Sequence, residues 1–359
     1  MRIVSMGLVL IISLIGVFIF KSLNLPIPWM LGPLIVMLIS QFFIRKINLE
    51  WPQSLRNLGL VIVGVAIGQS FQFDLFAGMG WIILIMFAMN ISLTAFSVGV
   101  SYVVQRIGNI PLKTSLTCTV PGGLSQIVTF AEEEKDINLA MVTYFHVIRV
   151  ISIVVLIPFI VSGHVVSGME GSGFKLETVL PLIILIAVAW LSALIGKKVK
   201  LPVSFFLGPV FLIIFFQFIH IETPEVPLWL LNIAQIFLGA YIGLLLKPHM
   251  VKVGARILFL GIASSIVLLL FTYIQSLILV FFLQYSLPTS FLSTAAGGLD
   301  QMSLIATSVG ADISVVTVFQ MFRLLFVFIV TIPLLKVACA WIDRRNSQKQ
   351  RNEVDISKT

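Results

Sequence analysis

The chain has 359 residues, of which 59% are hydrophobic and only 11% are charged, and its mean hydropathy is +1.10. A soluble domain carries about a quarter charged residues, so this composition excludes one and predicts a protein that crosses a membrane many times. The net charge of +8 does not indicate nucleic-acid binding, because the basic residues are scattered through short polar stretches and the C-terminal tail. Two cysteines, Cys118 and Cys339, lie in or beside apolar segments, which excludes a disulfide framework and a zinc site.

Twelve apolar segments follow one another along the chain. Helices are expected throughout, because an open strand cannot satisfy its backbone in lipid. The first segment has only Arg2 before it and no cleavage pattern after it, so it is expected to be a retained helix rather than a signal peptide. Polar residues 343–359 are expected to form a short, frayed cytoplasmic tail. The twelve segments cover roughly 3–20, 28–44, 57–73, 79–104, 114–131, 138–162, 178–195, 203–219, 228–246, 257–283, 290–309 and 313–341.

The second half of the chain repeats the first at an offset of about 175 residues. Matched blocks occur in the same order in both halves, which is hard to obtain by chance. The blocks are Leu25-Pro26 and Leu31-Gly32-Pro33 against Leu201-Pro202 and Leu207-Gly208-Pro209; Asn57, Gly64 and Gly68 against Asn232, Gly239 and Gly243; 121–126 against 296–301; and 145–149 against 319–323. We therefore predict two membrane repeats, 1–162 and 177–342, joined by a polar linker at 163–176.

The basic residues between segments predict how the two repeats are oriented. If all twelve segments crossed the bilayer, the basic clusters of the two halves would face opposite sides. If 114–131 and 290–309 instead enter and return, every cluster lies on the cytoplasmic side. Each half then has five crossings, so the sequence predicts two inverted repeats, with about ten spanning helices and two re-entrant or discontinuous ones. The clusters are Arg2; Arg45, Lys46 and Arg56; Arg106 and Lys113; Lys197, Lys198 and Lys200; Lys247, Lys252 and Arg256; and the tail.

A Gly-Gly phrase lies in each of the two exceptional segments. Two glycines destabilise a helix by about 2 kcal/mol relative to alanine, and Pro121 also removes a backbone donor. Both segments are therefore expected to break there, which exposes half-helix N-termini that attract anions. The alternative is a plain kink or close helix packing. The phrases read Pro121-Gly122-Gly123-Leu124-Ser125-Gln126 and Ala296-Gly297-Gly298-Leu299-Asp300-Gln301.

Charged residues within the apolar segments are the next candidates. Asp300 lies beside the second break, where a charge is costly unless it faces water or a partner, so it is either a proton or cation site or a helix cap. Arg149 and Arg323 each lie in an apolar helix and cannot lose their charge. They either bind the carboxylate or phosphate of a substrate, or neutralise Asp300 or the exposed C=O groups of the half-helices.

Amide and histidine side chains complete the candidate site. Gln126 and Gln301 recur in both phrases and can both donate and accept hydrogen bonds. His146 occupies the position of Gln320 in the repeat and lies one turn from Arg149. It is either a proton relay or, more commonly for a single histidine, a hydrogen-bonded core residue. The pairs at 64 and 68 and at 239 and 243 have the spacing of glycines that let helices approach closely.

The sequence offers no support for an enzyme. It has no phosphate-binding loop, no His/Cys metal spacing and no Ser-His-Asp set, so no catalytic residue, metal or cofactor is expected. The expected partners are the lipid bilayer and a small-molecule or ion substrate, and a homodimer stays open. Nucleic acid is not expected as a partner.

Several of these motifs together resemble the bacterial membrane AbrB family. The resemblance covers about residues 5–341. It departs from the family at Ala296, at Asp300, at Asn138 opposite Asp312, and at His146 in place of glutamine. The motifs are Leu25-Pro26 with Leu31-Gly32-Pro33, Pro121-Gly122-Gly123-Leu124-Ser125, and Ala311-Asp312 followed by Gln320 and Arg323.

The resemblance implies a fold of inverted repeats with crossed broken helices, because the family is grouped with cation/proton antiporters and bile-acid symporters. Its members are often labelled ammonia monooxygenases or regulators of gene expression. A monooxygenase would need a metal-ligand cluster, and the sequence shows none. A regulator of gene expression that acts on DNA would need a DNA-binding module, and the sequence shows none.

The function expected first is ion-coupled secondary transport of a small anionic solute across the bacterial inner membrane, with its site between the two Gly-Gly breaks. The alternative is a membrane sensor or regulator that binds a ligand without transporting it. An integral-membrane oxygenase is a distant third reading.

Overall fold

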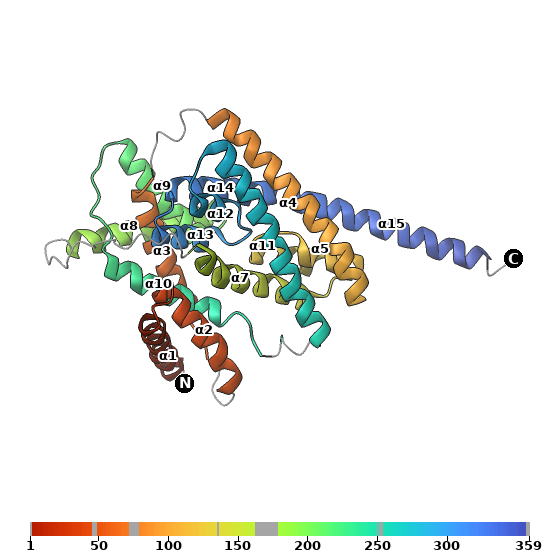
Figure 1. Cartoon of the computed structure of the whole chain (residues 1–359), viewed down its shortest axis with the longest axis horizontal. Helices are drawn as coiled ribbons and strands as arrows, with labels where there is room; N and C mark the ends of the chain where they lie inside the picture. Colours follow the sequence, from red (N-terminus) through yellow and green to blue (C-terminus); the bar gives the residue numbers. More distant parts are fainter. Residues whose placement is uncertain are drawn as a thin grey trace.

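The computed structural model describes residues 2–44, 49–71, 79–134, 136–161, 179–248, 250 and 254–356, and every regular element among them is a helix (Figure 1). The predicted linker at 163–176 lies outside the described residues. The helices are α1 (Arg2–Ser22), α2 (Pro28–Phe43), α3 (Gln53–Gln69), α4 (Met79–Gly108), α5 (Leu112–Thr119), α6 (Leu124–Glu133), α7 (Leu139–Val161), α8 (Val179–Lys198), α9 (Ser204–Phe218), α10 (Leu228–Gly243), α11 (Ala255–Leu283), α12 (Leu287–Thr294), α13 (Leu299–Val309), α14 (Ile313–Phe326), a π-helical turn (Val327–Thr331) and α15 (Ile332–Ile356).

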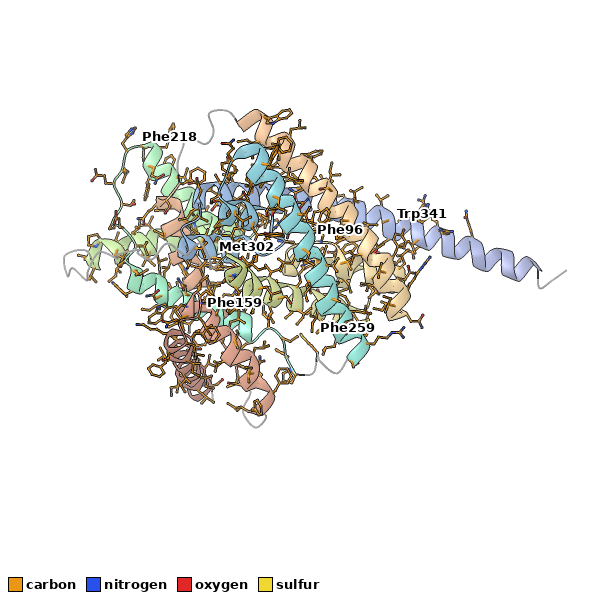
Figure 2. All side chains as sticks on the ribbon, viewed as in Figure 1. Phe96, Phe159, Phe218, Phe259, Met302 and Trp341 are labelled. Carbon is orange, nitrogen blue, oxygen red and sulfur yellow. The ribbon has the colours of Figure 1, made fainter. Side chains whose placement is uncertain are left out.

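Six stretches of helix within the described ranges are long and apolar enough to cross a membrane. Their outward faces carry large apolar side chains. Figure 2 places Phe218 and Phe259 at the periphery and Met302 in the interior, in agreement with exposed fractions of 69%, 71% and 0%. Apolar surface of this extent suits lipid rather than water. The predicted all-helical class is confirmed for the described residues, and these helices are consistent with the predicted multi-pass membrane protein. The stretches are Ser5–Ser22, Gly80–Gly108, Leu139–Val161, Val179–Lys198, Ala255–Leu283 and Ile313–Arg345.

Helices of each repeat pack against helices of the other repeat. Helix α3 packs on α9, and its repeat equivalent α10 packs on α2. A methyl group added to Gly64 on α3 would lie 2.6 Å from the backbone oxygen of Phe206 on α9. One added to Gly239 on α10 would overlap the backbone oxygen of Met30 on α2. The predicted role of these glycines in close helix packing is therefore confirmed.

The C-terminal tail differs from the frayed segment that the sequence predicts. Helix α15 continues without interruption to Ile356, and Figure 1 shows it extending away from the rest of the molecule. Extending an existing helix requires no new nucleation, and the arginine, lysine and glutamine residues of this stretch are good helix formers. Arg345 also lies over the ring of Trp341 one turn earlier, at 5.4 Å.

Candidate functional site

Both Gly-Gly phrases break their helices, as predicted. Helix α5 ends at Thr119 and α6 begins at Leu124, while α12 ends at Thr294 and α13 begins at Leu299. The last residue of each break has extended backbone, with φ −67° and ψ 136° at Gly123 and φ −80° and ψ 148° at the matching glycine. Neither of these residues offers a side-chain cap to the helix that follows. The first N–H groups of α6 and α13 therefore receive no cap from the residue that usually supplies one.

A steric reason for the second glycine of each phrase is also visible. A methyl group added to Gly123 would overlap Oε1 of Gln126, and one added to Gly298 would overlap Oε1 of Gln301. Each glutamine, three residues into its helix, thus folds back over the glycine that precedes the helix. Since the φ angles are ordinary, room for this side chain rather than backbone freedom requires glycine.

In the second repeat, the hydrogen bonds place α12 and α14 side by side and parallel. The backbone N–H of Asp312 donates to Oγ1 of Thr289 at 2.9 Å, so the two helices begin at the same level. Further along, Nε2 of Gln320 donates to the carbonyl oxygen of Leu292 at 2.6 Å. Helix α13 leads from the C-terminal end of α12 to the N-terminal end of α14. It must therefore run antiparallel to both helices.

The first repeat has the same arrangement. The backbone N–H of Asn138 donates to Oγ1 of Thr114 at 3.2 Å, and Nε2 of His146 lies 2.9 Å from the carbonyl oxygen of Thr117. Helices α5 and α7 therefore run parallel, and α6 runs back. The pairs fall about 175 residues before their counterparts, so the sequence repeat is also a repeat of hydrogen bonds.

Arg149, which is buried, and Arg323, which is partly buried, each donate hydrogen bonds to the carbonyl groups that a break exposes. Arg149 donates through Nη1 to Thr119 and Val120, at 3.5 and 3.4 Å, and through Nη2 to Gly122 at 3.2 Å. Arg323 donates to the carbonyl groups of Ala295 and Gly297. A cation at the C-terminal end of a helix is favoured both by the free carbonyl groups and by the helix dipole.

This geometry matches one of the two readings of the arginines. Both neutralise the carbonyl ends of half-helices, and neither forms an ion pair with Asp300 within the described ranges. Asp300 is 7% exposed and lies in the first turn of α13, where its Oδ2 accepts a hydrogen bond from Nε2 of Gln301 at 3.0 Å. Its position at a helix N-terminus also agrees with the capping alternative.

His146 is fully buried, and both of its ring nitrogens are engaged. Nε2 faces the carbonyl oxygen of Thr117 and therefore carries the proton, while Nδ1 accepts from Nη2 of Arg149 at 2.7 Å. This is the arrangement of a hydrogen-bonded core residue. Its repeat counterpart, Gln320, contacts the equivalent carbonyl groups of α12.

A cavity of about 450 Å³ lies between the two breaks and brings eleven of the thirteen predicted residues together. His146 lies behind Arg149 and does not line it, and the side chain of Ser125 is outside the described part of the structure. The eleven are Pro121, Gly122, Gly123, Gln126, Arg149, Gly297, Gly298, Asp300, Gln301, Gln320 and Arg323.

Sequence reasoning missed Arg56, which also lines this cavity. Its guanidinium lies 4.6 Å from the centre of the Tyr241 ring, and its charge acts on Asp300. In the sequence it looks like one more basic residue near a segment end, and its repeat counterpart is Leu231, so matching the halves gave no signal. The predicted segment starts at residue 57, but α3 begins at Gln53, so Arg56 lies within the helix rather than in the preceding loop. An earlier predicted helix start would have identified it.

The cavity lining carries more positive than negative charge. Three guanidinium groups, from Arg56, Arg149 and Arg323, face one carboxylate, that of Asp300, among its described residues. The N-termini of α6 and α13, helices of 10 and 11 residues, add partial positive charge from both repeats. The cavity is therefore electrostatically suited to an anion.

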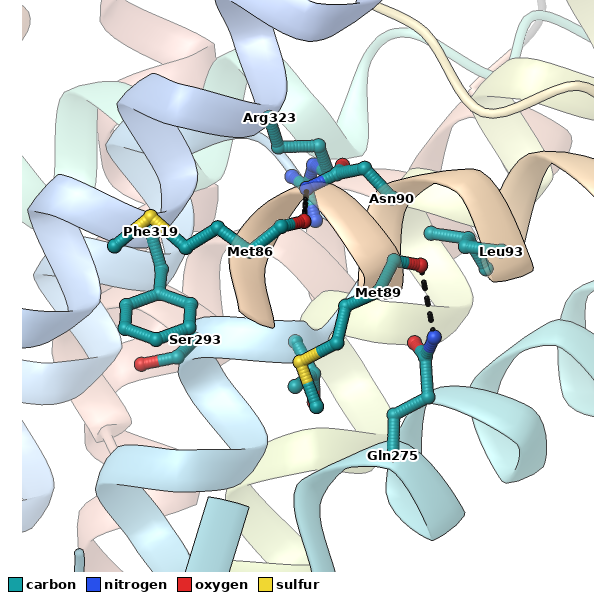
Figure 3. A pocket seen from close by; sticks show the side chains of 9 residues that line it. Met86, Met89, Asn90, Leu93, Gln275, Ser293, Phe319 and Arg323 are labelled. Atoms are coloured by element: carbon teal, nitrogen blue, oxygen red, sulfur yellow. Dashed lines mark hydrogen bonds between the residues drawn. The ribbon is translucent and has the colours of Figure 1, made fainter. Parts of the chain in front are cut away.

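A second, much smaller cavity adjoins Arg323 (Figure 3). Its volume is about 20 Å³, enough for a single water molecule, and it lies between α4, α11, α12 and α14. Met89 of α4 accepts a hydrogen bond from Nε2 of Gln275 of α11 at 2.9 Å in its wall. Arg323 lines both cavities, so its side chain lies between them.

Fold and site together define a class of multi-helix membrane proteins in which each of two repeats carries a broken helix. Within that class, the model of the family described as "Transition state regulatory protein AbrB" matches residues 29–338, and this chain belongs to the AbrB family. The chain is similar to "Uncharacterized protein YhjN" of Bacillus subtilis, with 28% identity over 91% of each chain. It is also similar to "Putative regulator AbrB" of Escherichia coli, with 25% identity over 97% of this chain and 100% of the relative.

Proposed function

We propose that this protein is an ion-coupled secondary transporter of a small anionic solute, and that the solute binds in the cavity between the two breaks. The observation that carries the proposal is the convergence of both Gly-Gly phrases on one cavity with an excess of guanidinium groups. Broken helices that meet from two repeats are a recurrent way to build a transport site. The proposal assigns no enzymatic step to this cavity.

The proposal includes two inverted repeats, which relate the fold to the cation/proton antiporters and bile-acid symporters. Support comes from α4 and α11, which are repeat equivalents. Phe96 stacks on Phe271 with ring centres 4.0 Å apart, and Gln275 donates to the carbonyl oxygen of Met89. Residue numbers therefore rise along α11 as they fall along α4. Equivalent helices that pack antiparallel are expected of repeats inverted about an axis in the membrane plane.

Ten crossings result if the shorter helices α2, α3, α9 and α10 span the bilayer with the six long stretches. The hairpins α5–α6 and α12–α13 are then re-entrant from opposite sides. The cavity is lined by Gln53 at the start of α3, by Val203 before α9 and by Leu245 after α10. These helix ends adjoin basic loops, so in a bacterial inner membrane the cavity faces the cytoplasm.

A sensor or regulator that binds the same ligand without moving it is the second candidate. The observation in its favour is the word "regulator" in the name of the Escherichia coli relative and "regulatory" in the family description. This reading uses the same cavity and the same charges. It differs from transport only in that no solute crosses the membrane.

Purified protein in proteoliposomes distinguishes the two candidates. A thermal-shift screen of small anions identifies a ligand, and uptake of that ligand is then measured with imposed proton and sodium gradients. Transport requires accumulation that depends on one of the gradients and is abolished when the gradient is collapsed. Binding with no flux in either direction would favour the sensor.

A further inference from the structure

Three glutamine residues line the cavity beside the cations. Oε1 atoms of Gln126, Gln301 and Gln320 are buried and have no hydrogen-bond partner among the described residues. Gln320 is only 1% exposed, and its Nε2 donates to the carbonyl groups of Leu292 and Ala295. Since those bonds fix which way the amide faces, its oxygen is the atom left for a ligand.

Donors without partners lie on the same cavity. Nε of Arg149, a residue 3% exposed, has no acceptor within the described structure. The first turn of α6 adds backbone N–H groups without a side-chain cap, whereas in α13 the carboxylate of Asp300 accepts from the N–H groups of Asp300 and Gln301. A buried polar group without a partner is costly, so the ligand that fits here must satisfy both kinds of group.

We infer that the solute is a small carboxylate that also carries a hydrogen-bond donor, either a hydroxyl or an ammonium group. This inference rests on the proposed function and narrows its substrate class. The carboxylate accepts from the arginines and the N-terminus of α6, which a plain carboxylate would also do. A hydroxyl satisfies one of the amide oxygens of Gln126, Gln301 and Gln320, and an ammonium group up to three, whereas a plain carboxylate leaves all of them unpaired. An ammonium group would in addition pair with Asp300.

The test uses ligands matched in size that differ in one group. Binding of propionate, lactate and alanine, and of succinate, malate and aspartate, is measured on the purified full-length protein by calorimetry. The donor-bearing member of at least one series should bind about tenfold or more tightly than the plain carboxylate, because a site built around a donor rejects the analogue that lacks it. Equal affinities within both series would overturn the inference.

A matched pair of variants locates the effect. Gln126→Leu removes one of the three oxygens, so it should lower the ratio between the affinity for the donor-bearing ligand and the affinity for its plain analogue. Gln217→Leu is the control, because its Oε1 is also buried without a described partner but does not line the cavity. An unchanged preference in Gln126→Leu, or an equal loss in both variants, would contradict the assignment.

A further variant distinguishes an ammonium donor from a hydroxyl donor. The ligand series also distinguishes failure of this inference from failure of the proposed function. Asp300→Asn should weaken alanine or aspartate more than lactate or malate if the donor is an ammonium group, and should affect both kinds of ligand to the same extent if the donor is a hydroxyl. If propionate and succinate bind as tightly as their partners, this inference fails and the proposed function stands. If no carboxylate binds, the proposal of an anionic solute fails as well.

Discussion

Arg149 and Arg323 each span several carbonyl groups at once. Arg149 reaches three carbonyl groups and Arg323 two, through separate nitrogens of one planar group. A lysine ammonium has no such fork and cannot cover the same span. The arginines therefore fix the ends of α5 and α12 and, through them, the shape of the cavity.

Replacing either arginine by lysine should lower the free energy of unfolding by about 1–3 kcal/mol, because carbonyl groups in the breaks lose their donors. Ligand-induced thermal stabilisation should be lost in Arg149→Lys and Arg323→Lys, while membrane insertion stays intact. Thermal melts with and without ligand measure both effects. A full ligand response in both lysine variants would refute a role for the fork.

The N-cap glycines lead to a second residue-scale prediction. Gly123→Ala and Gly298→Ala would force Gln126 and Gln301 away from their positions over the breaks. Ligand affinity is expected to fall about tenfold in each, which corresponds to about 1.4 kcal/mol. Gly99→Ala on α4 is the control, since nothing lies within 4 Å of an added methyl group there. Affinity changes that are equal at all three positions would contradict this account.

The repeat explains which site residues could be predicted from the sequence. Arg149 and Arg323 recur at matched positions, so their shared environment was detectable. Arg56 has a leucine as its counterpart, and a pattern based on symmetry could not find it. The contact of His146 Nε2 with Thr117 depends on tertiary packing against α5, which residue spacing along α7 does not reveal. Its Nδ1 contacts Arg149 one turn along α7, and this neighbour follows from the spacing.

At the scale of elements, the C-terminal helix is fastened to the first hairpin. Buried Lys113, at the start of α5, pairs with Asp343 of α15 at 2.5 Å. A second pair, Lys336 with Glu133, joins α15 to the end of α6 at 3.6 Å, but both of its side chains are more than half exposed. Only the first of these pairs is expected to hold the helix firmly.

Asp343→Asn should therefore loosen α15 and expose Cys339, which is fully buried beside this pair. The rate of reaction of Cys339 with a thiol reagent is expected to rise several-fold, with buried Cys118 as the internal reference. Glu133→Gln should leave both rates unchanged, because it removes only the exposed pair. A faster reaction in Glu133→Gln than in Asp343→Asn would show that the pairs have been ranked wrongly.

Helix positions were largely predictable because apolar runs and glycine breaks are local signals. The predicted segment 79–104, for example, corresponds to α4 (Met79–Gly108). The direction of the chain after each break was harder to predict from the sequence. The parallel pairing of α12 with α14 involves tertiary contacts such as the hydrogen bond between Asp312 and Thr289. The continuation of α15 to Ile356 differs from the prediction because the polar composition of residues 343–359 alone indicates a frayed end.

For the whole molecule, the proposed inversion of the repeats predicts that successive loops lie on opposite sides of the membrane. The loop at 197–200 carries three lysines and is expected in the cytoplasm, whereas the linker at 163–176 is expected outside. Single cysteines introduced in each loop, in a background without Cys118 and Cys339, should react with an impermeant reagent from opposite sides. Reaction of both loops from the same side would rule out five crossings in each repeat.

The proposed transport is tested most directly by solute accumulation in proteoliposomes with an imposed ion gradient, with Asp300 as the candidate coupling residue. The parent should accumulate the solute, while Asp300→Asn should lose accumulation but retain solute exchange. Asp312→Asn is the matched control, because Asn138 already caps α7 as Asp312 caps α14. If Asp300→Asn accumulates solute like the parent, with the same pH dependence, Asp300 is a helix cap and coupling at this site is refuted.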